Sequence, residues 1–490
     1  MAINSKKIRI LFLVFLAAVE LLAVRTAVAE NPIVLPEIGD PSGTLLTPSQ
    51  EQELGAAFFR SLYGKVKVNQ DIEIDDFIEE LGERLAVASD NPLQPFRFFV
   101  VMDPEINAFA GPGGYIGVNS GLILNTESES ELASVIAHEI AHVTQRHLYR
   151  AFEAARRLTI PSAAALLAGI LIGTQSAEMG QAAVLAAQAA SAQYQIDFTR
   201  DHEQEADRVG MQNLARSNFD PRAMPNFFER LERSSRYYGE GPPEFLRTHP
   251  VTSSRISDTR GRAEKFPYRQ FLDSTPYLLK RAKLQVLTAI KPSTTIQHFE
   301  SKLERGTDTQ KMVARYGLGL ALVAGGQSAK ARPILMELME KNPEQEAFIK
   351  ALAELESTSG NLENGLKLYT RAIEQFPNNR AIRLDYAEAL VQAEKFDAAR
   401  ELLTDYLSHH SPTPELYALL SRAYGNLGQN GQSHRYLAES YYLSGQTEPA
   451  IKQARIALNQ TQGNHYLTAL LEDRLIVFVA EEEERKKDSP

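Results

Sequence analysis

The residues with the clearest potential for chemistry lie between Ala133 and Leu148, where three of the ten histidines of the chain fall within ten residues. A helix turns by about 100° per residue, so His138 and His142 lie one turn apart on one face. Two imidazoles in this arrangement can bind one tetrahedral metal ion, and the adjacent Glu139 can reach a water held by that ion. The H-E-x-x-H spacing therefore predicts a metal-dependent hydrolase with Glu139 as general base.

The residues around this motif leave open whether the histidines are only structural, and which residue supplies a third metal ligand. A histidine pair on an apolar helix can be purely structural, and the neighbours of His138 and His142 are apolar. The same apolar neighbours place the motif below the surface, where desolvation raises the basicity of Glu139. His147 follows His138 by nine positions, or about 900° on a continuous helix. We therefore expect His147 on the opposite face, and the third ligand must come from elsewhere.

The segment TRDHEQEADRVG, residues 199–210, offers that third ligand. Glu203 and Asp207 are four residues apart and share one helical face. Glu203 would complete a His-His-Glu set with an open fourth position for water, as a catalytic zinc ion requires. Asp207 would then either orient a ligand imidazole or donate a proton to the leaving amine. The alternative for both is an ordinary charged helix face. His202 points about 100° away from Glu203 and is left out.

Two further segments could face a substrate. In RTHPVTSSRI, Pro250 stiffens the loop that carries His249. We expect this imidazole either to stabilise the oxyanion or to gate the open metal position, and the alternative is a residue that only packs the loop. The stretch GPGGYIGVN, residues 111–119, is a candidate edge for pairing with an extended peptide, because glycines permit close backbone approach. Its alternative is a plain hairpin turn.

The composition bounds the kinds of site that are available. A chain of 490 residues exceeds one ordinary core, so two or more domains are expected. The net charge of −10 and the lack of a basic stripe argue against a nucleic-acid partner. The sequence contains no cysteine, which excludes disulfides, cysteine–zinc clusters and thiol catalysis. Any metal ion must therefore be held by His, Asp or Glu.

The N-terminus has the layout of a secretory signal peptide. Basic residues precede an apolar run over Ile10–Val19, and Ala27–Ala29 offers small residues to signal peptidase, which predicts cleavage after residues 1–29. The alternative is an uncleaved membrane anchor. Glu20 and Arg25 interrupt the apolar stretch before the roughly 20 residues that a span needs. We therefore expect an exported protein.

A second apolar stretch lies within the alanine-rich segment 158–192. Its core, IPSAAALLAGILIG, contains a proline and is shorter than the roughly 20 residues of a membrane span. We expect a buried or surface-lying helical hairpin, and peripheral contact with a membrane stays open. The alternative is a membrane-embedded protease.

The second half of the chain contains an internal repeat. Similar stretches begin at Gly326, Gly360, Glu394 and Gly428, with a constant spacing of 34 residues (360−326, 394−360 and 428−394). A period of about 34 residues with paired helices resembles the tetratricopeptide repeat, in which each helix pair buries its face against the next. The alternative is an irregular helical domain.

These patterns predict a mainly α fold with a small β-sheet. Residues 51–90 have helical periodicity, FRFFVVMD (96–103) is typical of a strand, and a long helix is expected from Ser128 through residue 157. The expected domains are a metallopeptidase at 30–265, a helical linker at 266–310, a repeat solenoid at 311–480 and an unstructured charged tail at 481–490.

In combination, NAFAGPGGYIGVNSGLI, HEIAHVTQRH, HEQEAD and THP followed by R resemble the zinc metallopeptidase family of HtpX and the CAAX prenyl endoprotease. The resemblance implies a gluzincin-type domain that binds one Zn²⁺ per chain. It implies that His138, His142 and Glu203 are the zinc ligands. It also implies that Glu139 is the catalytic base and that Asp207 is the proton donor.

An exported branch of this family joins the peptidase to tetratricopeptide repeats. That branch implies a periplasmic location and an endopeptidase that degrades misfolded or stalled outer-membrane β-barrel proteins and assists their assembly. The repeats would dock the barrel assembly machinery. The alternative is a scaffold or chaperone whose repeats act in assembly while the protease site is slow or latent.

Overall fold

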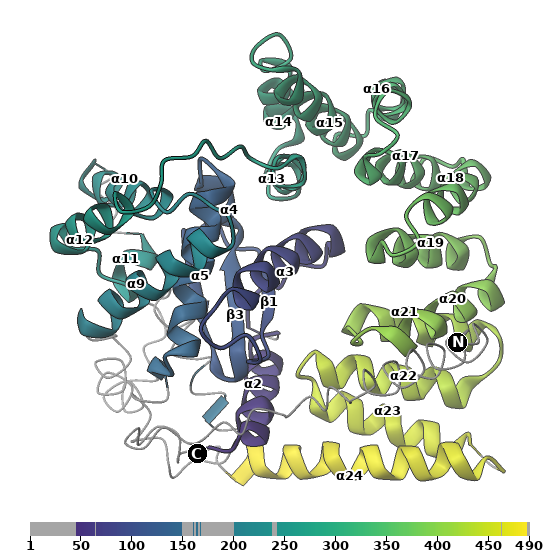
Figure 1. Cartoon of the computed structure of the whole chain (residues 1–490). Coiled ribbons are helices and arrows are strands. Elements are labelled where there is room, and N and C mark those ends of the chain that lie inside the picture. The colour runs from purple at the N-terminus through teal and green to yellow at the C-terminus, as the bar shows by residue number, and fades with distance from the viewer. Residues whose placement is uncertain are drawn as a thin grey trace, which may run out of the picture. The chain divides into compact units, whose positions relative to one another are not determined.

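The computed structural model describes residues 46–63, 65–148, 160, 163–164, 167, 200–237, 243–461 and 463–487 (Figure 1). The predicted signal peptide and nearly all of the alanine-rich segment lie outside these residues. Helices dominate the described part, and one sheet of three strands accompanies them. This confirms the predicted fold class. No helix within the described ranges is both long and apolar enough to cross a bilayer.

The sheet consists of β1 (Arg97–Val101), β2 (Ala108–Ala110) and β3 (Tyr115–Asn119). Its order is β1-β3-β2, with β3 parallel to β1 and antiparallel to β2. The strand predicted within residues 96–103 is therefore confirmed. Because β3 has a neighbour on each side, the prediction that residues 111–119 form a free edge is wrong. Among the described residues, the outer strands are β1, which has a single bridge on its outer side between Val101 and Val68, and β2, which has no strand partner on its outer side.

The chain turns between β2 and β3 through the short 3-10 helix η2 (Pro112–Gly114). Gly113 and Gly114 have φ angles of 67° and 80°, a region that glycine adopts without strain. A Cβ on Gly114 would lie 2.1 Å from the carbonyl oxygen of Pro95. The glycines of this stretch thus make a tight turn possible.

Eight helices with described bounds accompany the sheet in residues 46–263. They are α2 (Pro48–Tyr63), α3 (Ile72–Val87), α4 (Ser120–Asn125), α5 (Glu129–Thr144), α9 (Arg200–Arg216), α10 (Ala223–Tyr237), α11 (Glu244–Thr248) and α12 (Ser253–Ala263). The predicted helical region 51–90 is therefore two helices, α2 and α3. As expected, Ser128 caps α5, because its side chain accepts a hydrogen bond from the Glu131 N–H.

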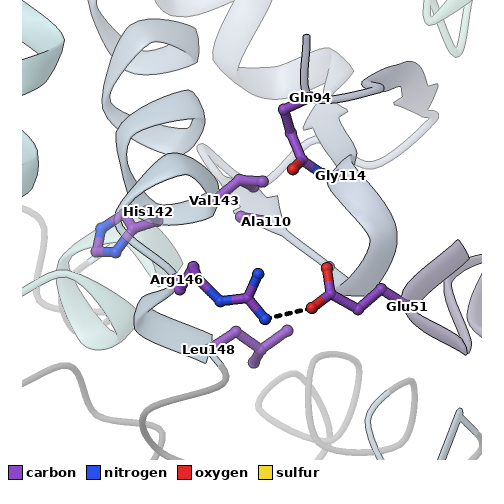
Figure 2. A pocket seen from close by; sticks show the side chains of 9 residues that line it. Glu51, Gln94, Ala110, Gly114, His142, Val143, Arg146 and Leu148 are labelled. Carbon is purple, nitrogen blue, oxygen red and sulfur yellow. Dashed lines mark hydrogen bonds and ion pairs between the residues drawn. The ribbon is translucent and has the colours of Figure 1, made fainter. Parts of the chain in front are cut away.

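The helix α5 ends earlier than the sequence suggested. It was expected to continue through residue 157, but it stops at Thr144. Arg146 then has a φ of 55°, in the left-handed region that is uncommon outside glycine. The Arg146 guanidinium forms an ion pair with Glu51 of α2, which ties down this turn (Figure 2). The left-handed residue sends the following chain in a new direction.

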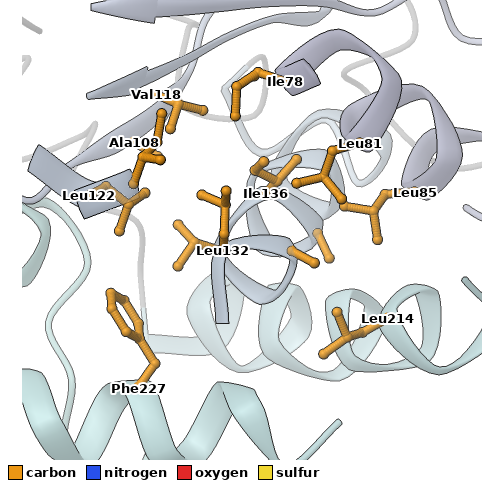
Figure 3. Close-up of a cluster of buried hydrophobic side chains, with 14 of the residues drawn as sticks. Ile78, Leu81, Leu85, Ala108, Val118, Leu122, Leu132, Ile136, Leu214 and Phe227 are labelled. Carbon is orange, nitrogen blue, oxygen red and sulfur yellow. The ribbon is translucent and has the colours of Figure 1, made fainter. Parts of the chain in front are cut away.

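The main core forms around α5. Its apolar side chains, among them Leu132 and Ile136, pack against α3, the sheet, α9 and α10 (Figure 3). Both residues are completely buried. Fully burying an aliphatic side chain of this size stabilises the fold by about 1.5–3 kcal/mol. A helix covered on all sides by apolar contacts is a rigid support for the polar groups that it carries.

The remainder of the described chain is a series of paired helices. They are α13 (Thr275–Leu287), α14 (Pro292–Glu300), α15 (Asp308–Ala324), α16 (Ser328–Lys341), α17 (Glu346–Thr358), α18 (Leu362–Gln375), α19 (Arg380–Gln392), α20 (Phe396–His409), α21 (Pro414–Asn426), α22 (Asn430–Leu443), α23 (Thr447–Asn459) and α24 (His465–Lys487). The helices α16, α18, α20 and α22 begin 34 residues apart (362−328, 396−362 and 430−396). This confirms the predicted period.

The repeat boundaries coincide with backbone turns. The four predicted starts, Gly326, Gly360, Glu394 and Gly428, all have left-handed φ angles between 57° and 90°. Each lies two residues before a helix begins, where the chain must reverse between paired helices. The predicted unstructured tail is wrong as far as Lys487, because α24 continues to that residue.

A buried cluster of charges joins α3 to the repeat helices. Glu73 of α3 is 4% exposed. It accepts a hydrogen bond of 2.7 Å from Lys280, contacts Lys283 and lies 3.2 Å from Lys350 of α17. Lys350 also pairs with Asp385 of α19 at 2.5 Å. Burial would raise the pKa of Glu73, but the three lysines hold it well below its ordinary value.

Candidate metal centre

The two histidines of the motif meet as their spacing predicted. His138 and His142 lie on α5 with their Nε2 atoms 3.0 Å apart, and their side chains are 0% and 1% exposed. Burial lowers the pKa of His142 well below its ordinary value, so this imidazole is neutral. Burial acts in the same direction on His138, but Asp207 and Glu203 raise its pKa to about 9. A metal ion binds imidazole in the neutral form, so it would compete with a proton at His138.

Glu203 comes to these histidines from α9. Its Oε2 lies 3.5 Å from His138 Nε2, and its Oε1 lies 3.4 Å from His142 Nε2. The two helices can approach because Gly210 has no side chain. A Cβ at that position would lie 3.0 Å from the carbonyl oxygen of Ala137. Gly210 therefore allows the close packing of α5 and α9 that brings Glu203 to the histidines. This role of Gly210 was not predicted from the sequence.

The donor atoms fit one divalent ion. With metal–ligand bonds of about 2.0–2.1 Å, the ligand atoms of a tetrahedral site lie roughly 3.3 Å apart. The two histidine Nε2 atoms are 3.0 Å apart, and each lies near a different oxygen of Glu203, with Oε2 3.5 Å from His138 and Oε1 3.4 Å from His142. These three residues and His249 each offer one ligand atom, and the four atoms lie within 4.8 Å of one another. Two nitrogens and one carboxylate oxygen form a donor set that suits zinc.

Glu139 lies beside this set and is completely buried. Burial raises the pKa of its carboxyl group, and the nearby His249 and His138 only partly offset this effect. Neither carboxylate oxygen has a hydrogen bond of standard geometry within the described part of the chain, although the nearby backbone N–H of Ala110 also lowers the pKa. A buried carboxylate with raised pKa and spare acceptor capacity can take a proton from a reacting water.

Asp207 lies behind His138 and is bound by an arginine. Its Oδ1 is 3.0 Å from His138 Nδ1, and both its oxygens accept 2.7 Å hydrogen bonds from Arg255 of α12. Burial would raise the pKa of Asp207, but Arg255 and then His138 lower it. Arg255 is 1% exposed and also lies 2.7 Å from Glu203 Oε2. Arg255 is the arginine that follows THP in the sequence, and its contacts with Asp207 and Glu203 were not predicted.

His249 is the fourth residue of the group that could hold a metal ion. It follows α11 and is 2% exposed. Its Nδ1 hydrogen-bonds Glu203 Oε1 at 3.0 Å, and its Nε2 lies 3.5 Å from Glu139 Oε1. The imidazole thus lies between the expected third ligand and the expected base.

His147 does not lie where helical geometry was expected to place it. Its Nδ1 is 2.8 Å from His142 Nδ1, and its side chain is 0% exposed. The prediction that His147 lies on the opposite face assumed a continuous helix, and the left-handed Arg146 overturns that assumption. His202, which was left out, stacks on His147 with ring centroids 4.4 Å apart. Neither residue belongs to the four-residue group.

Known proteins share these features. Residues 75–263 match the model of Peptidase family M48, and residues 313–344 and 358–423 match tetratricopeptide repeat models. The Putative beta-barrel assembly-enhancing protease of Vibrio cholerae is 37% identical over 87% of this chain and 88% of its own length. The chain belongs to the β-barrel assembly-enhancing protease family.

Two further relatives show how much of the chain is shared with known peptidases. The Beta-barrel assembly-enhancing protease of Escherichia coli K12 is 32% identical over 91% of either chain. The Mitochondrial metalloendopeptidase OMA1 of Arabidopsis thaliana is 32% identical over 33% of this chain and 30% of its own length. The H-E-x-x-H motif, residues 138–142, lies inside the region that matches Peptidase family M48. The predicted family resemblance is confirmed, and this member is a metalloendopeptidase.

A pocket of this peptidase lies beside the end of β2 and borders one residue of the metal centre, His142. Figure 2 shows Ala110 at the end of β2, His142 and Arg146 around this space. The Arg146–Glu51 ion pair borders it as well. The complete lining consists of Glu51, Gln94, Ala110, Gly111, Gly114, His142, Val143, Arg146 and Leu148. The end of β2 and one proposed metal ligand, His142, therefore line the same pocket.

Proposed function

We propose that this protein is a zinc endopeptidase of the periplasm that cleaves misfolded or stalled outer-membrane β-barrel proteins and assists their assembly. The observation that carries the proposal is the buried group of His138, His142 and Glu203 beside the carboxylate of Glu139. The proposed metal is one Zn²⁺ per chain. The relatives from Vibrio cholerae and Escherichia coli are named β-barrel assembly-enhancing proteases, which supports the substrate class.

In this mechanism, Glu139 accepts the proton of the attacking water and passes it to the leaving nitrogen. Bound zinc would supply a water of near-neutral pKa and polarise the peptide carbonyl. Asp207 was expected either to orient a ligand or to donate a proton. Its paired hydrogen bonds to Arg255 keep it ionised and support the first role, in which it orients His138.

Substrate would enter as an extended segment. The side of β2 that has no strand partner can form backbone hydrogen bonds with a peptide, and Ala110 of this strand lines one pocket with His142. Unfolded β-strands suit such a cleft because they expose unpaired backbone groups. We place the peptidase in residues 30–265 and assign docking of the assembly machinery to the repeats at 311–480, joined by the linker at 266–310.

Removal of the metal tests this proposal. The purified protein is treated with a chelator, dialysed, and assayed on an unfolded outer-membrane β-barrel protein and on casein. We expect cleavage to disappear and to return after addition of one equivalent of Zn²⁺ per chain, with Mg²⁺ as a control that does not restore it. Full cleavage by metal-free protein would contradict the proposal.

His249 is proposed to gate the open metal position. Its hydrogen bond to Glu203 and its 3.5 Å separation from Glu139 support this role, because both residues belong to the proposed site. We expect His249→Ala to cleave casein several-fold faster, because the blocked state no longer reduces the competent fraction. Metal content is measured in parallel, so that loss of zinc is not mistaken for a catalytic effect. A fall in cleavage at full zinc content would instead assign His249 to oxyanion stabilisation, and unchanged cleavage would remove both roles.

A further inference from the structure

The Nδ1 atoms of the two histidines of the metal centre contact different residues. His138 is backed by Asp207, a carboxylate that a buried arginine clamps. His142 is backed by the neighbouring imidazole of His147, with 2.8 Å between the two Nδ1 atoms. His147 in turn lies 3.1 Å from Glu205 Oε2 through its Nε2 atom. A continuous chain of polar contacts therefore runs from His142 to Glu205.

The direction of these hydrogen bonds follows from the chemistry of the ligand. If His142 binds a metal through Nε2, its ring proton must lie on Nδ1, and this N–H needs an acceptor. The Nδ1 atom of a neutral His147 can be that acceptor only when its own proton lies on Nε2. Glu205 favours this tautomer, because its carboxylate accepts the Nε2–H.

The fold holds this relay in place by two independent features. The left-handed backbone of Arg146 turns His147 back toward α5, so that a residue five positions after His142 can reach its ring. On the other side, the ring of His202 stacks on His147 with an interplanar angle of 17°. His202 and Glu205 both belong to α9, the helix that also carries Glu203. One helix therefore supplies the expected third ligand and the end of the relay.

We propose that His147 is a positioning residue that fixes the tautomer and ring orientation of His142, and that Glu205 fixes His147. This inference rests on the proposed zinc site and adds a second partner set to it. Such outer contacts typically contribute about 10- to 100-fold in metal affinity. The relay ends near the surface, since the Glu205 side chain is 32% exposed.

Zinc affinity of the full chain, measured by competition with a chromogenic chelator, tests the relay. We expect His147→Phe, which keeps the stacked ring, to bind zinc about 10- to 100-fold more weakly. His147→Asn can still present an amide oxygen near the former Nδ1 and is expected to recover part of the loss. The matched control is His298→Phe, on the distant helix α14, which should leave the affinity unchanged.

A spectroscopic measurement separates positioning from general loss of structure. The visible absorption of the Co²⁺-loaded protein reports ligand geometry, and we expect it to change in His147→Phe but not in His298→Phe. If His147→Phe does not fold, the half-buried Glu205→Ala is measured instead, and a loss of several-fold in zinc affinity is expected.

An affinity within two-fold of wild type together with an unchanged Co²⁺ spectrum, in either folded variant, would overturn the relay. Failure of the proposed function looks different. In that case the wild-type protein itself would bind no zinc at the centre.

Discussion

Glu139→Gln is expected to lose about 10²- to 10⁴-fold in kcat/KM while it keeps its zinc, because general-base catalysis contributes an effect of this size. The amide has nearly the same shape as the carboxylate but cannot accept a proton at neutral pH. Glu139 lies on α5 between the two histidines and is completely buried, so the substitution leaves the helix and the proposed ligands in place.

The measurement pairs cleavage of casein and of an unfolded β-barrel protein with metal content for each variant. Glu53→Gln on the exposed face of α2 is the matched control, since it removes an equal charge from the surface. Loss of cleavage with loss of zinc would instead identify Glu139 as necessary for the metal site. Unchanged cleavage would remove Glu139 from the mechanism.

The same variant separates the peptidase from its alternative function. If cells that carry only Glu139→Gln still assemble outer-membrane β-barrels normally, the repeats act as a scaffold without the protease. If assembly fails, peptide-bond cleavage is required. The tetratricopeptide helices are present in both cases, so only the chemistry differs.

Arg255→Met is expected to lower the free energy of unfolding by about 3–5 kcal/mol, because it breaks a buried ion pair and leaves the Asp207 carboxylate buried without a compensating charge. Arg255 donates two hydrogen bonds to Asp207 and approaches Glu203, and all three side chains are 1–2% exposed. Without the guanidinium, two buried carboxylates remain near each other. Denaturant unfolding measures the loss.

Three further variants control this experiment. Arg262→Met, on the same helix and paired with Asp258 at the surface, should cost less than about 1 kcal/mol. Arg255→Lys keeps the charge but loses the paired hydrogen bonds, so its loss in free energy of unfolding should lie between those of Arg262→Met and Arg255→Met. Addition of Asp207→Asn to Arg255→Met should restore part of the stability, because the two residues form one network. Equal losses for Arg262→Met and Arg255→Met would show that the buried pair has no special role.

The sequence was informative where local geometry decides the outcome. Four-residue spacing placed His138 and His142 on one face, and the 34-residue period located the turns before α16, α18, α20 and α22. Glu203 was predicted from chemistry, because the motif needed a carboxylate. Its approach depends on Gly210, whose role becomes visible only when α5 and α9 are packed together.

The errors share a physical cause: each depended on a feature that is not periodic. The position of His147 follows from a left-handed non-glycine residue, Arg146, which sequence patterns rarely reveal. Strand order in the sheet is set by long-range pairing, so the stretch 111–119 was wrongly expected at an edge. Arg255 reaches Asp207 across 48 positions in sequence, and no spacing rule connects them.

The buried carboxylate of Glu73 has a consequence for how this molecule can be divided. All three of its lysine partners come from helices that follow the peptidase region, α13 and α17. A fragment cut before α13 would leave the Glu73 carboxylate without its three lysine partners and would remove the contacts of α13 with α3. The peptidase and the helices that follow it therefore share one buried cluster of ion pairs. We expect the excised peptidase to be less stable than the same residues within the intact chain.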